Sequence, residues 1–213
     1  MIAIKFVAVA IMAYLLGSIP FGLIVGRLSR GIDVRQHGSR KTGATNVMRT
    51  TGTKLGVLTL LLDVAKAVAA VILAKVIIGD AVLPLVGSIS LNWQVAQVIA
   101  GLAVVAGHNW PIFAKFKGGR GVTAFFGAMF AIYPPAALLG TEVLATVALR
   151  SRRMSLGSIL GIVATWCLMI PLTIAYNLPP VYLAYASVCM ALVIYQHRDN
   201  IKRLKHGTEH QLF

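Results

Sequence analysis

The chain has 213 residues, of which 58% are hydrophobic and only 12% are charged, and its formal net charge is +14. Soluble globular domains are about 45–50% apolar and about 25% charged, so this composition excludes an ordinary soluble protein and predicts an integral membrane protein. No polar domain is available to form a basic groove, so we expect no nucleic-acid partner despite the positive charge.

Five apolar runs approach the length of about 20 residues that a membrane-spanning helix needs. They cover residues 4–26, 55–78, 96–113, 157–176 and 179–196. The first run resembles a signal peptide, but it continues past Pro20 to Arg27 and Arg30, so we interpret it as a retained span. Cys167 and Cys189 lie within apolar runs and lack metal-ligand spacing, which indicates buried side chains rather than a disulfide or a zinc site.

The stretch 122–149 is too long for one span and is interrupted by Pro134 and Pro135, which remove two backbone donors and disfavour helix just before them. Each half has about 14 residues and would reach about 21 Å as a helix. We therefore predict two short spans or a re-entrant hairpin in this stretch.

The positions of the cations predict the orientation, since cytoplasmic loops of membrane proteins are enriched in Lys and Arg. Four stretches, 27–54, 115–120, 150–153 and 198–205, hold 17 of the 20 Lys and Arg residues. All four fall on one side if the hairpin crosses twice. The prediction is thus an all-α integral membrane protein of about seven transmembrane helices, a single domain over residues 1–213, with the N-terminus outside and the C-terminus cytoplasmic.

The first basic loop reads GSRKTGATNVMR over residues 38–49. Its cations alone are typical of a solvated cytoplasmic loop. Its glycines stand beside hydroxyl and amide side chains, however, and such backbone can turn its N–H groups inward around an anion. From this loop we expect substrate contacts by Lys41, Thr45 and Asn46.

A second basic segment, KFKGGRGVT at residues 115–123, stands directly before an apolar run. Its glycines allow close backbone approach, and a helix beginning near Val122 would direct unpaired N–H groups toward the segment. Lys115, Lys117 and Arg120 add positive charge. This pattern suits a phosphate site, but it lacks the spacing of a nucleotide P-loop, so we do not infer ATP.

Three further groups of polar residues stand beside or inside the apolar runs. His108 directly precedes the glycine segment and is interpreted as structural, orienting that loop. Asp63 and Lys66, one helical turn apart inside the second span, are expected to pair, because an unpaired charge at that depth costs several kcal/mol. In the basic tail, His197 can transfer a proton near neutral pH, although lone histidines are more often structural.

Several common catalytic patterns are absent from the sequence. It contains no H-x-x-x-x-D pair, no G-x-S-x-G elbow and no H-E-x-x-H motif, and it has only six acidic residues. A two-metal site is therefore not expected. We predict no metal and no cofactor, and any catalysis should use cations and backbone dipoles.

Four segments taken together resemble one family. They are GSIPFG (17–22), HGSRKTGATNVMR (37–49), GHNWPIFAKFKGGRGV (107–122) and HRDNIKRLKHGTE (197–209). In order and spacing they are similar to the bacterial membrane glycerol-3-phosphate acyltransferases that use acyl phosphate, the PlsY family. The resemblance covers essentially the whole chain.

The resemblance implies transfer of a fatty acyl group from acyl phosphate to the 1-hydroxyl of sn-glycerol 3-phosphate, giving lysophosphatidic acid and phosphate. It further implies a multi-pass protein of the bacterial cytoplasmic membrane with its active site on the cytoplasmic side, in contact with membrane lipid and working as a monomer. Catalytic roles carry over to Ser39, Arg49, His197 and Asn200. The glycerol 3-phosphate site carries over to Lys117, Gly118, Gly119, Arg120 and Gly121, and a structural role carries over to Glu209.

Two segments depart from the family pattern, at three positions. Arg40-Lys41 stands where the family has Gly-Asn, which removes a flexible residue and adds charge, and Arg120 stands where it has lysine. The main alternative from the residues alone is a membrane carrier for a phosphorylated solute. A carrier would have polar residues spread through the middle of several spans, and here only Asp63, Lys66 and Glu142 qualify.

Overall fold

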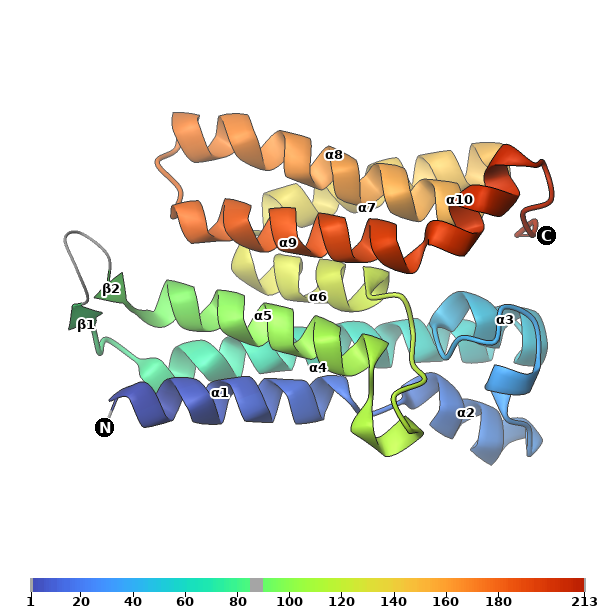
Figure 1. Cartoon of the computed structure of the whole chain (residues 1–213), viewed down its shortest axis with the longest axis horizontal. Coiled ribbons are helices and arrows are strands. Elements are labelled where there is room, and N and C mark those ends of the chain that lie inside the picture. The colour runs from blue at the N-terminus through green and yellow to red at the C-terminus, as the bar shows by residue number, and fades with distance from the viewer. Residues whose placement is uncertain (1, 85–89, 213) are drawn as a thin grey trace. The chain divides into compact units, whose positions relative to one another are not determined.

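The computed structural model describes residues 2–84 and 90–212, and its regular structure is almost all helical (Figure 1). The helices are α1 (Ile2–Gly17), α2 (Phe21–Arg30), α3 (Ala44–Thr51), α4 (Thr53–Ile78), α5 (Trp93–Asn109), α6 (Val122–Ile132), α7 (Pro134–Ser151), α8 (Met154–Ala175), α9 (Pro180–Gln196) and α10 (Arg198–Lys205). Two 3-10 helices, η1 (Val34–Gln36) and η2 (Ile112–Ala114), and a two-residue antiparallel ladder of β1 (Leu83–Pro84) with β2 (Ser90–Leu91) complete the list.

The chain divides into two compact units, Met1–Ile132 and Tyr133–Phe213. The first unit contains the first basic loop and the glycine segment, and the second contains the basic tail. That the whole chain forms a single acyltransferase domain stays a prediction.

Four described helical segments are long and apolar enough to cross a membrane: Ile2–Arg30, Thr53–Ile78, Trp93–Ala114 and Met154–Ala175. Val122–Ile132 and Pro180–Gln196 are shorter apolar helices. The prediction of an all-helical, multi-pass membrane protein is thereby confirmed. The count of seven spans and the placement of the two termini stay predictions.

The first predicted span is interrupted, because α1 ends at Gly17 and α2 begins at Phe21. Pro20 stands at the N-cap of α2, where a missing N–H breaks no helical hydrogen bond. Its carbonyl oxygen accepts from the N–H groups of Leu23 and Ile24 at 2.9 and 3.0 Å, which starts the new helix.

The predicted break in 122–149 is confirmed, but the predicted equal halves are wrong. The first helix, α6, has 11 residues and the second, α7, has 18. Pro134 and Pro135 occupy the first turn of α7, where a helix does not need their missing N–H groups, so α7 starts at the first proline. Whether both helices cross the membrane stays a prediction.

In the first unit, α1, α4, α5 and α6 run side by side (Figure 1). The close contact of α1 with α5 depends on glycine. A Cβ at Gly17 would overlap the backbone of Val104, and a Cβ at Gly107 would overlap the carbonyl of Tyr14. Small residues of this kind allow apolar helices to pack in lipid, where no hydrophobic effect drives them together.

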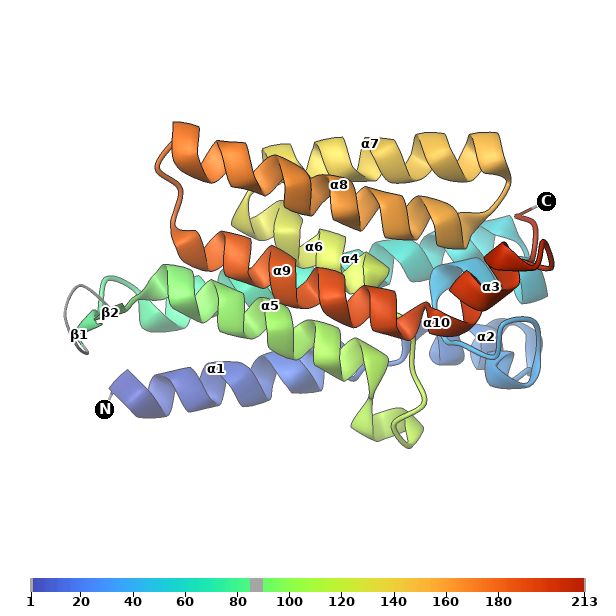
Figure 2. The same cartoon turned by 45° about the horizontal axis from the view of Figure 1, so that its top comes forward.

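In the second unit, α7 packs along α8, and α9 packs along α8 (Figure 2). Gly157 and Gly161 of α8, four residues apart, face the backbone of α7. A Cβ on Gly157 would lie 2.5 Å from the carbonyl oxygen of Leu144, and one on Gly161 would lie 2.8 Å from that of Gly140. The short helix α10 follows α9 and contacts both α8 and α9.

The two cysteines of this unit differ in burial. Cys189 on α9 is buried as predicted, but the prediction that Cys167 on α8 is buried is wrong, because its side chain is exposed. An apolar run in a membrane protein includes residues on the outer face of the helix, since lipid tails are as apolar as the packed face.

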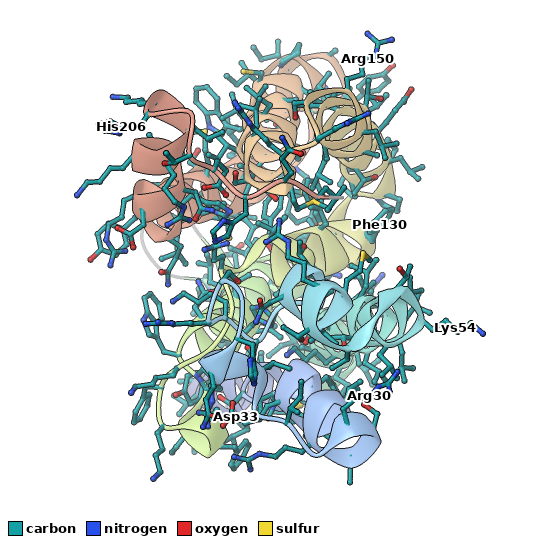
Figure 3. The ribbon with its side chains drawn as sticks, turned by 90° about the vertical axis from the view of Figure 1, so that its right-hand side faces the viewer. Arg30, Asp33, Lys54, Phe130, Arg150 and His206 are labelled. Carbon is teal, nitrogen blue, oxygen red and sulfur yellow. The ribbon has the colours of Figure 1, made fainter. Side chains whose placement is uncertain are left out.

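The polar connections of the first unit lie at one end of its helices. Figure 3 looks onto this end, where Arg30, Asp33 and Lys54 are labelled. The first basic loop and the glycine segment lie there, whereas β1 and β2 lie at the opposite end (Figure 1). Two basic stretches distant in sequence thus share one end of the unit, which agrees with the prediction that both lie on the same side of the membrane.

Candidate functional site

The side chain of Asn46 organises the first basic loop from its interior. It is only 2% exposed, and its Oδ1 accepts a hydrogen bond from the Ser39 N–H at 2.8 Å. Its Nδ2 donates to the carbonyl oxygens of Val34 at 2.8 Å, His37 at 3.2 Å and Lys41 at 2.8 Å. A side-chain amide has only two N–H donors, and here both donors of Asn46 are occupied by these backbone carbonyl oxygens. Asn46 therefore shapes the loop, and the expectation that it binds substrate has no support from these contacts.

Asp33 and Arg35 connect this loop to the glycine segment. The guanidinium of Arg35 donates to Asp33 Oδ1 at 2.9 Å and Oδ2 at 2.6 Å, and its Nη1 donates to the Ala114 carbonyl oxygen at 3.0 Å. The hydrogen bonds from Arg35 hold the pKa of the Asp33 carboxyl well below its usual range, although partial burial acts in the opposite direction. This pair was not predicted, because its only signal in the sequence is an acid two residues before an arginine.

Arg40 adopts a left-handed backbone conformation, with φ of 57°. Its N–H donates to the His37 carbonyl oxygen at 3.0 Å, closing a turn in which Gly38 also has positive φ. Arg40 is accommodated in this turn because it takes up a backbone conformation that glycine adopts readily.

This conformation makes the stability of the loop sensitive to the residue at position 40. We expect Arg40→Gly to be neutral or stabilising by up to about 1 kcal/mol, and Arg40→Val to destabilise by about 1–2 kcal/mol, because a β-branched residue strongly disfavours positive φ. Thermal unfolding in detergent measures both variants. Equal melting temperatures for the two would show that the turn is not held in this conformation.

The glycine segment is folded against the end of α5. The N–H of Gly119 donates to the His108 carbonyl oxygen at 3.0 Å, and the N–H of Phe116 donates to that of Pro111 at 2.9 Å. Lys115 and Phe116, just before the glycines, both have positive φ. Two consecutive non-glycine residues in this region are strained, at a cost of about 1–3 kcal/mol each, and such strain concentrates at functional sites.

The two basic stretches meet in the first unit. The N–H of Thr42 lies 3.5 Å from the Gly118 carbonyl oxygen, and Arg35 reaches Ala114 as described above. The helix α6 begins at Val122, directly after the segment, and this confirms the prediction of a helix start there. The N–H groups of its first turn add positive potential at the site.

The predicted substrate and catalytic residues of the first unit lie on these elements. Ser39 is half-buried, with its N–H on Asn46, and Arg49 is half-buried in the last turn of α3. Lys41 and Thr45 are also half-buried, in the loop and in the first turn of α3. In the glycine segment Lys117 is exposed, Arg120 is half-buried, and Gly118, Gly119 and Gly121 are buried. The first unit therefore brings its expected residues to one end, although their contact with substrate stays a prediction.

The predicted residues of the tail all lie in the second unit. His197 lies between α9 and α10, with its Nδ1 2.8 Å from the Val193 carbonyl oxygen. A carbonyl oxygen only accepts, so Nδ1 carries a proton in this contact. The meeting of His197 and Asn200 with the loops of the first unit stays a prediction.

Glu209 holds the tail against α8 and α10. Its Oε1 accepts from Ser155 Oγ at 3.0 Å and Asn200 Nδ2 at 2.6 Å, and its Oε2 accepts from Arg203 Nε at 2.8 Å. Burial raises the pKa of this carboxyl, but the three hydrogen bonds outweigh burial and leave the pKa below its ordinary value. These contacts support the structural role expected of Glu209, and they orient the amide of Asn200.

This cluster should make the stability of the protein depend on pH. As pH falls from neutral, the unfolded carboxyl takes up a proton first, near pH 4.3, so the contribution of Glu209 is complete above that value and is lost as pH falls through the lower pKa of the folded state. We expect Glu209→Gln to cost about 2–3 kcal/mol at pH 7 and distinctly less at pH 3.5. Melting temperatures of both proteins at the two pH values test this, and an equal difference at both would attribute the loss to packing alone.

A metal centre has no candidate ligand group in the described ranges, 2–84 and 90–212, where no three His, Cys, Asp or Glu side chains gather. The loops of the first unit therefore offer cations, hydroxyl groups and backbone N–H groups. Such groups can bind phosphate oxygens and stabilise negative charge as it develops.

Known proteins similar to this chain share one description. The family model "Glycerol-3-phosphate acyltransferase" matches residues 7–207. A relative from Dehalococcoides mccartyi (strain ATCC BAA-2266 / KCTC 15142 / 195), named glycerol-3-phosphate acyltransferase 3, is 50% identical over 212 residues, covering 100% of this chain and 98% of the relative. A glycerol-3-phosphate acyltransferase from Synechocystis sp. (strain ATCC 27184 / PCC 6803 / Kazusa) is 40% identical over 202 residues, with 95% and 88% covered.

Solved structures give the same result. The fold is similar to crystal structures of PlsY, an integral membrane glycerol 3-phosphate acyltransferase, in its glycerol 3-phosphate form and its lysophosphatidic acid form. The TM-scores are 0.83 and 0.81, with 37% sequence identity, and the alignments cover 97% of this chain and 94% of the other.

Proposed function

This chain belongs to the glycerol-3-phosphate acyltransferase family, and we propose that it transfers a fatty acyl group from acyl phosphate to the 1-hydroxyl of sn-glycerol 3-phosphate. The acylation of glycerol 3-phosphate, a step of phospholipid synthesis, follows from the family and from 37–50% identity over nearly the whole chain. The acyl phosphate donor, the position of the hydroxyl and the residue roles are the proposed part.

One observation in the first unit carries the proposal. The loop with Ser39 and the segment with Gly118 are held against each other by the Arg35 contact to Ala114 and the approach of Thr42 to Gly118. Both substrates of the proposed reaction carry a phosphate group. Two adjacent cationic, glycine-containing loops on an apolar helical unit suit two phosphates and one acyl chain.

The reaction itself requires few groups from the protein. The glycerol hydroxyl oxygen attacks the acyl carbonyl carbon, an ester C–O bond forms, and the C–O bond to phosphate breaks with phosphate taking the electron pair. The proton of the hydroxyl goes to a phosphate oxygen. Because phosphate is a good leaving group, positioning of the two substrates supplies most of the acceleration.

The basic residues then have separate tasks. Arg49, Lys117 and Arg120 bind phosphate oxygens, and loop N–H groups stabilise the negative charge that develops on the carbonyl oxygen. Ser39 orients a substrate rather than attacking it, because the sequence has no histidine–aspartate relay to activate its hydroxyl. A stable acyl-serine on enzyme denatured after exposure to donor alone would refute this assignment.

The location of the reaction follows from the positions of the cations. We place the site on the cytoplasmic side of the bacterial inner membrane, where loops rich in Lys and Arg are retained. The enzyme is proposed to act as a monomer in contact with membrane lipid.

The experiment compares three donors on purified protein in detergent or lipid mesophase. Glycerol 3-phosphate is supplied with palmitoyl phosphate, palmitoyl-CoA or an acyl carrier protein thioester, and both phosphate release and lysophosphatidic acid are measured. Activity with acyl phosphate alone is expected. Activity with a thioester alone would refute the proposed donor, and inactivity with all three, in protein that still binds glycerol 3-phosphate, would favour a carrier.

A further inference from the structure

Lys66 is a cation enclosed within the first unit, in the middle of α4. Its side chain is only 3% exposed, and its Nζ lies 2.6 Å from Asp63 Oδ1, 2.9 Å from the Ile19 carbonyl oxygen and 3.3 Å from His108 Nδ1. An ammonium group has three N–H donors, and three polar atoms from different parts of the unit surround this one. The ring of Phe21, centred 5.6 Å away, adds a weaker attraction.

The three acceptors join separate parts of the unit. Ile19 belongs to the connection between α1 and α2, Asp63 lies one turn earlier on α4, and His108 lies in the last turn of α5. The carboxylate of Asp63 balances the charge of Lys66. A buried charge that loses its partner is costly, so the ammonium group holds these three elements at fixed separations.

His108 transmits this arrangement to the glycine segment. Nδ1 of His108 lies 3.3 Å from Lys66 Nζ and 3.5 Å from Asp63 Oδ1, so this ion pair fixes one edge of the ring, and Nε2 lies on the opposite edge. That edge of the ring lies against Gly119, because a Cβ on Gly119 would overlap Nε2. The carbonyl oxygen of His108 also accepts the Gly119 N–H at 3.0 Å. Gly119 is therefore fixed by both the ring and the backbone of one residue.

We propose that Lys66 and His108 are positioning residues for the binding of glycerol 3-phosphate, acting through Gly119 and not by touching substrate. This inference rests on the proposed function, in which the glycine segment binds the phosphate of that substrate. Lys66 fixes the position and orientation of the His108 ring, and the ring fixes the backbone position of Gly119 in the segment. Such a role goes beyond the pairing of Asp63 with Lys66 that the sequence predicts.

Removing this support should weaken the binding of one substrate specifically. We expect Lys66→Met and His108→Asn to raise both KM and Kd for glycerol 3-phosphate about tenfold or more, while KM for acyl phosphate changes less than about twofold. Lys66→Arg, which retains the charge, should recover part of the loss. A merely structural role would lower the melting temperature and the active fraction and leave both KM values unchanged.

Lys75→Met is the matched control. Lys75 lies on the same helix, makes a cation–aromatic contact with Trp93 at 4.4 Å and is near the opposite end of the unit from the glycine segment. The same substitution there should change neither KM value.

The variants and the wild type separate the outcomes. Because Lys66→Met leaves Asp63 buried without its cation, the pair Asp63→Asn with Lys66→Met is measured beside it, and His108→Asn tests the ring alone. Folded variants that bind glycerol 3-phosphate as tightly as the wild type would overturn this inference only. A wild-type protein that neither binds nor acylates glycerol 3-phosphate would refute the proposed function, and this inference with it.

Discussion

Asn46→Asp should disrupt the first basic loop, although the two side chains have nearly the same volume. The substitution replaces Nδ2, which donates to the carbonyl oxygens of Val34, His37 and Lys41, by an oxygen that can only repel them when ionised. The site is almost fully buried, so water does not compensate. We expect a loss of about 2–4 kcal/mol in the free energy of unfolding.

Activity should fall further than stability alone would predict. The N–H of Ser39 is held by Oδ1 of the same amide, and a catalytic group displaced by about 1 Å can lose about 10²-fold in rate. We therefore expect kcat/KM to drop at least about 100-fold in Asn46→Asp protein that remains folded. A folded variant with wild-type kcat/KM would show that activity does not depend on the hydrogen bonds of the Asn46 side chain.

Asn92→Asp is the matched control for this substitution. Asn92 caps α5, and its Oδ1 accepts the Val95 N–H at 3.1 Å. Aspartate caps a helix about as well as asparagine, and its charge is favourable at a helix N-terminus. We expect its unfolding free energy to change by less than about 0.5 kcal/mol and its activity to stay at the wild-type level.

Gly118→Ala should have the second large effect, for a steric reason. A Cβ on Gly118 would overlap the His108 carbonyl oxygen and lie 2.8 Å from that of Asn109. Both are backbone atoms at the end of α5, so neither can move without disturbing the helix end. We expect a loss of about 1–3 kcal/mol in stability and of at least about 100-fold in kcat/KM.

The measurement is steady-state kinetics for both substrates, with melting temperature as the test of folding. Gly31→Ala is the control, since Gly31 follows α2 with φ of 66° and a Cβ there would meet nothing within 4 Å. That variant should lose about 1 kcal/mol of stability and retain its activity. Comparable activities for Gly118→Ala and Gly31→Ala would contradict the close-contact argument.

The kind of chemistry at the basic segments could be predicted from the sequence, whereas the hydrogen-bond partners of individual residues could not. Glycines beside cations indicated anion binding, because backbone N–H groups and charge are local properties of a segment. Asn46, by contrast, was expected to contact substrate, and the structure shows its side-chain amide hydrogen-bonded to nearby backbone. Which partners an amide finds depends on how a loop closes on itself, and no spacing rule states that.

Arg40 gives a second instance of the same limit. It stands where the family has glycine, and it nevertheless adopts φ of 57° and closes the turn on His37. The energy of one unfavourable backbone conformation is about 1–2 kcal/mol, which the contacts of the surrounding loop can offset. A sequence shows that a residue disfavours a given backbone conformation, but it does not show which contacts offset that energy.

By itself, the sequence determined the membrane class, the helical architecture, the break at Tyr133 and the basic segments, because each follows from local hydropathy, proline and charge. Only the tertiary structure decided that Arg35 reaches Ala114, that Lys66 reaches Ile19 and His108, and that Glu209 joins Ser155 to Arg203. These contacts link residues far apart in the chain. They form because buried donors and charges must find partners wherever packing brings them, which is a property of the folded chain rather than of any segment.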